Sequence, residues 1–245
     1  TASTFHDEAH FAASVFNRPA VFSKSLFGGA ARFAGIATKQ TAIFCNVRFA
    51  GAADFSGATF TQYADFSGAR FDGDAMFSRS SFFAVIRTSY DMDFPQYANF
   101  ANAAFAQGAD FSEATFTAFV GFGRATFAGA VSFNGANFAG AYFAGAYFAD
   151  AKFSQKADFR QTRFAYAEPS FWDSEGQQKS ARFSAQANPQ DYLFEVRPES
   201  PHGFSCGEAQ LLNRTFVLPV GAVLYDPDSW DEEKQEYTRV SEPAQ

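Results

Sequence analysis

Residues 53–82 read ADFSGATFTQYADFSGARFDGDAMFSRSSF, and this stretch decides the fold. Its phenylalanines lie alternately five and six residues apart, and a small residue stands two positions before most of them, so the repeating unit has eleven residues. Outward from it, the spacing continues at Phe5, Phe11, Phe16, Phe22, Phe27, Phe33, Phe44 and Phe49, and at Phe94, Phe100, Phe105, Phe111, Phe116, Phe122, Phe127, Phe133 and Phe138. From there the steps are all of five, through Phe143 and Phe148 to Phe153.

This spacing fits neither an α-helix nor an ordinary strand. Successive steps of five would scatter the rings around a helix of 3.6 residues per turn, and a half-buried strand needs alternation every two residues. The pattern fits a coil whose five- or six-residue segments each form one side and point a ring inward. Gly, Ser, Asn and Asp between the rings suit the corners, and stacked coils pair their backbones as parallel strands.

The amount of Phe supports the same interpretation. The chain has 35 Phe among 245 residues but only 2 Met and 2 Trp. An ordinary globular core mixes side chains to fill irregular space, and it would not keep so many rings in one phase. We therefore predict one interior pocket shape that is repeated along the chain.

The segments ADFSGATF, ADFSGARF, ADFSEATF and ANFAGAYF resemble the pentapeptide-repeat family, in its Phe-centred variant with alternating five- and six-residue units. The resemblance implies an all-β fold, a right-handed four-sided parallel β-helix, over residues 1–164. With four sides, each coil would take about 22 residues instead of 20, and coils would stack about 4.8 Å apart. It also implies a function for some members, which bind DNA gyrase as mimics of duplex DNA and protect it from quinolones or toxins.

Two breaks interrupt the phase. Thr38 stands where a Phe is expected, between Phe33 and Phe44. Residues 83–93 lose the pattern, which resumes at Phe94 one residue out of step. We expect a bulge or projecting loop there, and both a partner-contacting loop and a tolerated insertion fit the sequence.

Residues 165–245 differ from the repeat and are expected to form an acidic C-terminal capping region. Residues 212–225, LNRTFVLPVGAVLY, predict two short strands around a Pro-Val-Gly turn. Asp228 and Ser229, followed by WDEEKQEY, predict a short capped helix. Two roles remain open for this region: a cap over the last coil and an acidic interaction element. Uncapped coil ends would favour end-to-end self-association.

The net charge of -7 comes from this tail. Residues 1–164 carry 13 Lys/Arg and 12 Asp/Glu, a net of +1, whereas residues 165–245 carry 6 and 14, a net of -8.

The chain contains no apolar run of about 20 residues, as a membrane helix requires, and no signal-peptide pattern. We therefore expect a cytoplasmic protein.

The sequence contains no grouping of residues that indicates catalysis, a metal site or a cofactor site. His6 and His10 superficially resemble a zinc motif, but that motif needs a helix, and both histidines fall within repeat sequence. His202 falls in a Pro-Gly loop. Cys45 and Cys206 are expected to be separate, buried or partly buried thiols. Asp54, Asp65, Asp110 and Asp158 each precede a Phe and are expected to be solvated or to bond to corners. We expect no catalytic, cofactor or metal residues, and no enzyme.

The hypothesis that needs only these features is a non-catalytic structural or protein-binding module with an unidentified protein partner. The alternative, implied by the family, is a DNA mimic whose partner is DNA gyrase. Mimicry requires an acidic surface comparable to the phosphate charge of DNA, which a segment of net +1 lacks in sum. Direct binding to nucleic acid is not expected.

Overall fold

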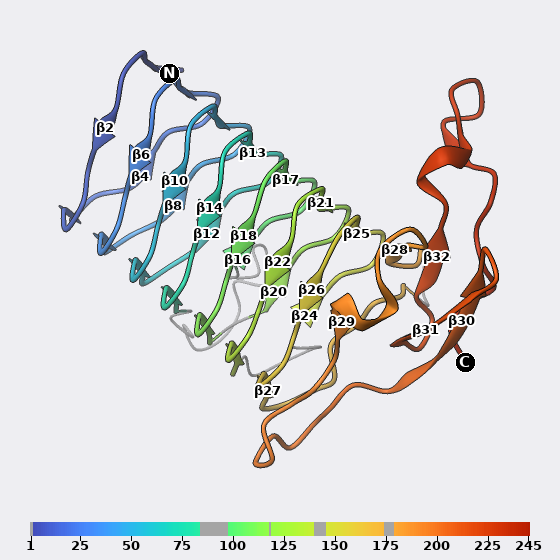
Figure 1. The fold of residues 1–245 in the computed structure, drawn as a ribbon. Helices are drawn as coiled ribbons and strands as arrows, with labels where there is room; N and C mark the ends of the chain where they lie inside the picture. The colour runs from blue at the N-terminus through green and yellow to red at the C-terminus, as the bar shows by residue number, and fades with distance from the viewer. Residues whose placement is uncertain (1, 84–97, 118, 140–145, 174–178) are drawn as a thin grey trace.

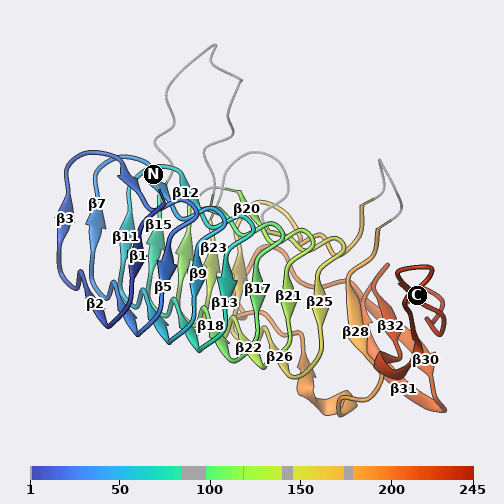
Figure 2. The ribbon, with the colours of Figure 1, turned by 90° about the horizontal axis from the view of Figure 1, so that it is seen from above.

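The computed structural model describes residues 2–83, 98–117, 119–139, 146–173 and 179–245. These residues form a parallel β-helix: short strands follow the chain around four sides, and strands of one side stack along the axis (Figures 1 and 2). The predicted all-β, four-sided β-helix is confirmed. We name the four sheets sides A, B, C and D, in the order in which the chain visits them.

The strands of each side pair in parallel with the next strand of the same side. Side A consists of β1 (Thr4–Phe5), β5 (Leu26–Phe27), β9 (Arg48–Phe49), β13 (Arg70–Phe71), β17 (Ala104–Phe105), β21 (Thr126–Phe127), β25 (Lys152–Phe153), β28 (Arg182–Ser184) and β32 (Val223–Tyr225). Side B consists of β2 (Ala9–His10), β6 (Ala31–Arg32), β10 (Ala53–Asp54), β14 (Ala75–Met76), β18 (Ala109–Asp110), β22 (Val131–Ser132), β26 (Ala157–Asp158) and β29 (Tyr192–Leu193).

The other two sides are shorter among the described residues. Side C consists of β3 (Val15–Phe16), β7 (Ala37–Thr38), β11 (Thr59–Phe60), β15 (Ser81–Phe82), β19 (Thr115–Phe116), β23 (Asn137–Phe138) and β27 (Arg163–Phe164). Side D consists of β4 (Ala20–Val21), β8 (Ala42–Ile43), β12 (Ala64–Asp65), β16 (Ala98–Asn99), β20 (Val120–Gly121) and β24 (Ala146–Tyr147).

The corner after each side B or side D Phe explains the five-residue step. At Phe55, the carbonyl accepts a hydrogen bond from Ala58 N at 3.0 Å, and Gly57 has φ +63°. A positive φ at the third position is the mark of a type II turn, which favours Gly. The equivalent position holds Asn46 and Glu113, with φ +54° and +56°. The small and polar residues between the rings are therefore corner residues, as predicted.

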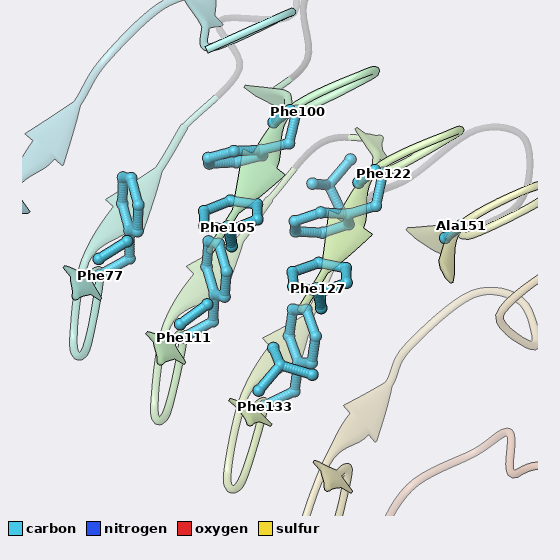
Figure 3. Packing of buried hydrophobic residues seen from close by; sticks show 14 of the residues in the cluster. Phe77, Phe100, Phe105, Phe111, Phe122, Phe127, Phe133 and Ala151 are labelled. Atoms are coloured by element: carbon cyan, nitrogen blue, oxygen red, sulfur yellow. The ribbon is translucent and has the colours of Figure 1, made fainter. Parts of the chain in front are cut away.

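The core consists of four columns of rings, one under each side. Figure 3 shows rings of sides A, B and D. In the side B column, Phe55 stacks on Phe33 at 4.8 Å and on Phe77 at 5.0 Å between ring centroids, with interplanar angles of 2° and 3°. The ring spacing equals the spacing of stacked strands, so one backbone register aligns every ring. Phe143 lies outside the described residues. The other predicted interior rings are all buried: Phe55, Phe60, Phe66, Phe71, Phe111, Phe116, Phe127, Phe133, Phe138 and Phe148.

The side B and side D columns meet in the middle of the core. Phe111 of side B packs edge-to-face against Phe100 and Phe122 of side D, at 5.2 and 5.3 Å. Contacts from the flanking columns are longer, as between Phe116 of side C and Phe122, at 6.4 Å. Edge-to-face pairs add to the energy of area burial, so the central columns hold the coils together most strongly.

Thr38 occupies the side C column where the sequence lacks a Phe. Its side chain is fully buried, and its Oγ1 has no hydrogen-bond partner among the described residues. A buried hydroxyl without a partner costs free energy.

Thr38→Val is therefore expected to raise the free energy of unfolding by about 1 kcal/mol, because valine keeps the shape and removes the hydroxyl. Chemical denaturation measures the change. Thr59→Val is the matched control, since Thr59 is the outward residue of the next side C strand. A loss of stability in Thr38→Val, or an equal gain in both variants, would contradict the prediction.

Within residues 1–164, the two intervals that contain additional residues between rings both fall at the corner between sides C and D. Phe116 and Phe122 are six residues apart there, but Phe82 and Phe100 are eighteen apart, and Phe100 still stacks under Phe66 at 5.0 Å. The predicted bulge at residues 83–93 lies outside the described residues, apart from Phe83, as does Phe94.

The interval from Phe138 to Phe148 differs from what the sequence predicted. The run of steps of five, from Phe138 to Phe153, predicted a strictly five-residue repeat. Instead, Phe138 belongs to side C, and Phe148 stacks on Phe122 of side D at 5.1 Å. The alternation of five and six therefore continues, with four additional residues between Phe138 and Phe148, because pairing with the preceding coil fixes which ring enters a column.

Sides A, B and D of the solenoid continue beyond residue 164, the expected end of the repeat, and on side D Phe171 stacks on Phe148 at 5.0 Å. Strands β28 and β32 extend side A, and β29 extends side B. Phe183 stacks on Phe153 at 4.6 Å, so the side A column also continues. Residues 165–245 therefore add strands to the stack as well as the irregular segments at its C-terminal end (Figure 1).

The hairpin predicted within residues 212–225 is displaced. The antiparallel pair is β30 (Cys206–Leu211) with β31 (Arg214–Pro219), joined at Leu212 and Asn213, which both have positive φ. Two positive φ values suit a two-residue hairpin turn. The Pro-Val-Gly sequence instead leads from β31 into β32, because Val223–Tyr225 pairs in parallel with β28.

The short helix predicted from Asp228 is absent from this segment. Asp226 caps a single 3₁₀ turn, η2 (Pro227–Ser229), and an antiparallel pair follows, β33 (Trp230–Asp231) with β34 (Glu236–Tyr237). Asp231 accepts hydrogen bonds from the backbone N of Glu233 and Lys234, both at 3.0 Å. Such local bonds compete with helix formation. A second 3₁₀ turn, η1 (Pro189–Asp191), precedes β29.

Candidate interaction surfaces

The surface of the solenoid is built from one outward side chain per strand. Successive residues of a strand point to opposite faces. In each two-residue strand, one residue therefore points inward and the other outward. The outward residue precedes the inward Phe, as Arg70 precedes Phe71 and Asp54 precedes Phe55, except in β7, where Ala37 precedes Thr38. Stacking then aligns outward residues into rows along each side, so each side carries its own chemistry.

The aspartates of sides B and D act on the corners. Asp54, Asp65 and Asp110 each accept a hydrogen bond from the backbone N two residues later, at 2.9 Å. Asn99 bonds in the same way to Ala101 N, at 3.0 Å. This local bond stabilises the turn that follows the Phe. The expectation that these residues bond to corners is confirmed, and their carboxylates are held close to the backbone.

Acidic residues do not form an unbroken row among the described residues. The outward row of side B runs His10, Arg32, Asp54, Met76, Asp110, Ser132 and Asp158. That of side D runs Val21, Ile43, Asp65, Asn99, Gly121 and Tyr147. Neutral side chains thus separate the carboxylates of side B, and the row of side D has one carboxylate, Asp65.

A shallow groove of about 390 Å³ runs over side B. Met76, Ala109 and Val131 line its floor, and Asp74 and Asp158 stand among its polar residues. Burial acts to raise the pKa of Asp158, but hydrogen bonds from Arg160 outweigh it and lower that pKa below its ordinary value. Asp74 is bonded to Gly108 N at 3.1 Å. The groove therefore presents carboxylates that already have partners.

Side A carries basic residues in adjacent strands. Arg48 and Arg70 are neighbours in register, and the Nε of each bonds to Asp72, at 2.7 and 2.5 Å. The hydrogen bond from Arg70 holds the pKa of the Asp72 carboxyl below its ordinary value, assisted by Arg48 and opposed by burial. Asp72 is therefore ionised at neutral pH, and the group of three has a net charge of +1.

At the C-terminal end of side A, Lys152 is covered by aromatic residues. Its Nζ donates to Tyr237 Oη at 3.1 Å and lies 5.9 Å from the centre of the Tyr225 ring. Tyr225 is buried and shares a hydrogen bond with Ser154 at 2.9 Å, and burial raises its pKa to about 12. The β33–β34 pair is thereby attached to the solenoid.

The histidines and cysteines are dispersed. His10 Nε2 lies 3.2 Å from Glu8 Oε2, His6 is exposed, and His202 is partly buried beside Phe164. Both cysteines are free; Cys45 is partly buried, but Cys206 is exposed at the start of β30, contrary to expectation. Within the described ranges, no group of three or more His, Cys, Asp or Glu is placed to hold a metal ion. No helix in those ranges is long and apolar enough to span a bilayer.

Comparison with known families agrees with the fold. A family model described as pentapeptide repeats (9 copies) matches residues 39–81, and another, described as pentapeptide repeats (8 copies), matches residues 122–155 and 129–164. A search of curated proteins finds no significant match. Both matched segments lie within the stack of ring-bearing strands, so residues 39–81 and 122–164 of this chain are pentapeptide repeats.

Proposed function

We propose that this protein is a non-catalytic binding module whose rod presents a fixed surface to a protein partner. The observation that carries the proposal is the difference between the sides: outward residues are fixed in register by the ring columns, and each side has its own row. Side A has adjacent arginines, and side B has separated carboxylates over a groove. Surfaces fixed before binding lose little conformational entropy on association.

DNA mimicry is the weaker proposal. Duplex DNA carries one negative charge per about 1.7 Å of its axis, whereas strands of one side are about 4.8 Å apart. The row of side B alternates carboxylates with neutral residues from Asp54 onward, and the row of side D has one carboxylate, Asp65. The carboxylates of Asp54, Asp65 and Asp110 are also bonded to their own corners. No described feature favours gyrase as the partner.

Affinity isolation with the purified chain as bait tests the proposal. We expect a protein that co-purifies stoichiometrically and whose binding is reproduced with the two purified components. Variants that change outward residues of one side should abolish binding, while matched changes on another side leave it intact. A reconstituted partner that binds equally to every surface variant would contradict the proposal. Inhibition of gyrase supercoiling at sub-micromolar concentration would replace it by DNA mimicry.

A further inference from the structure

The N-terminal coils carry an unbalanced positive charge. Residues 9–53 contain five Lys/Arg and neither Asp nor Glu: Arg18, Lys24, Arg32, Lys39 and Arg48. Two of these have acidic partners from outside that segment, since Arg32 pairs with Glu8 and Arg48 with Asp72. The ion pairs found within the described residues include none for Arg18, Lys24 or Lys39, and all three are exposed.

The same coils expose aliphatic side chains. Val21 and Ile43 are outward residues of side D and lie directly opposite each other in β4 and β8. Val21 is 56% exposed, Ile43 is partly buried, and Val15, on the adjoining side C, is 55% exposed. In the next strand of side D the outward residue is Asp65, opposite Ile43, and its carboxylate bonds to Ser67 N and to Asn99. The aliphatic pair therefore ends at that strand.

The unpaired cations border this pair on both edges of side D. Arg18 lies at the corner between sides C and D, three residues before Val21, and Lys39 joins it there because its backbone N bonds to Phe16 O at 2.9 Å. Lys24 lies at the opposite corner with φ +60°. We call Arg18, Val21, Lys24, Lys39 and Ile43 the side D patch. An apolar centre with a charged rim is the usual arrangement of a protein interface.

We propose that the side D patch binds an acidic segment of a protein partner in which apolar residues are interspersed. This rests on the proposed function and specifies the chemistry of the partner. Three unpaired cations around two strands match the charge of a few carboxylates. They do not match duplex DNA, which presents one charge per about 1.7 Å of its axis. The exposed apolar residues are aliphatic, while proteins that bind membrane interfaces favour Trp and Tyr. A peptide with both carboxylates and aliphatic side chains fits both parts of the patch.

The test uses a fluorescein-labelled twelve-residue peptide of Glu and Asp alternating with Leu and Val, and fluorescence anisotropy with the full chain. We expect Arg18→Gln with Lys39→Gln to weaken binding about tenfold, because each removes an attractive charge. Val21→Thr with Ile43→Thr, which keeps the β-branched shape, should weaken it about fivefold through lost apolar contact. Arg79→Gln with Arg163→Gln, which changes the charge equally outside side D, should change affinity less than twofold.

Three further probes decide between occupants. A peptide with Ser in place of Leu and Val, a duplex oligonucleotide and vesicles of anionic lipid should all bind more weakly than the mixed peptide. Four outcomes would each overturn the proposal. The Arg79 and Arg163 control could weaken binding equally, or the threonine variants could have no effect. The mixed peptide could fail to bind, or DNA or vesicles could bind more tightly than it does. If an isolated partner still binds all patch variants, the patch fails while the binding-module function stands.

Discussion

Phe111→Ala is expected to lower the free energy of unfolding by about 4–5 kcal/mol, which is the upper end of the usual range for Phe-to-Ala changes in a core. Phe111 is fully buried and stacks on Phe77 and Phe133, at 4.9 and 5.0 Å. It also packs edge-to-face against Phe100 and Phe122. Removing it leaves a cavity in the central columns, where neighbouring rings are fixed by the strand register and cannot move inward.

A gradient across the core makes this prediction specific. Phe116→Ala, in the flanking side C column, should cost about 3 kcal/mol, because its edge-to-face contact is longer. Phe5→Ala should cost less still, since that ring is only partly buried at the N-terminal end. Urea denaturation followed by circular dichroism measures all three variants. Similar losses for Phe5 and Phe111 would show that the columns do not support one another.

The repeat could be predicted from the sequence because each coil uses the same local rules. Ring spacing, the small residue two positions earlier and the corner residues all recur, as at Ala53, Phe55 and Gly57, and nearest-neighbour stacking is enough to hold the fold. The resemblance to pentapeptide repeats supplied the number of sides, which the spacing alone does not specify. The alternation of five and six follows from two kinds of corner, of which only the shorter has the positive φ.

Features that depend on pairing between distant segments could not be predicted. The step of ten residues from Phe138 to Phe148 contains Phe143 at a spacing of five, so the sequence mimics a regular repeat. In the tail, Val223–Tyr225 has the composition of a hairpin strand, and only its parallel pairing with β28 places it in side A. The segment after Asp228 has a helix-capping pattern, but the bonds to Asp231 favour a turn.

The side D patch shows the same limit at the level of function. The positive charge of residues 9–53 is visible in the sequence. It does not appear in the net charge of residues 1–164, because acidic residues elsewhere in that range offset it. Val21 and Ile43 are 22 residues apart, and only the assignment of β4 and β8 to one side shows that they are adjacent. Outward chemistry can therefore be inferred from such a repeat once each residue has been assigned to a side.

Deletion of residues 191–245 is expected to cause self-association, because it uncovers the C-terminal end of the ring columns. Phe194 stacks on Phe159 at 5.5 Å, Tyr192 packs on Phe183 at 5.0 Å, and Phe204 packs on Phe164 at 5.2 Å. The deletion also removes β29 and β32, which leaves β26 and β28 as unpaired edges. Exposed edges beside apolar rings favour pairing with other chains.

Light scattering coupled to size-exclusion chromatography compares the deletion with the full chain, and the oligomer should grow with concentration in the deletion alone. The deletion also removes negative charge, and loss of negative charge is a second route to association. Glu232→Gln with Glu233→Gln therefore serves as the control. It removes two negative charges at an exposed turn and leaves the covering contacts in place. The control should match the full chain. A deletion with the same mass as the full chain at every concentration would show that residues 191–245 are not a cap, and it would favour an independent role for them in binding.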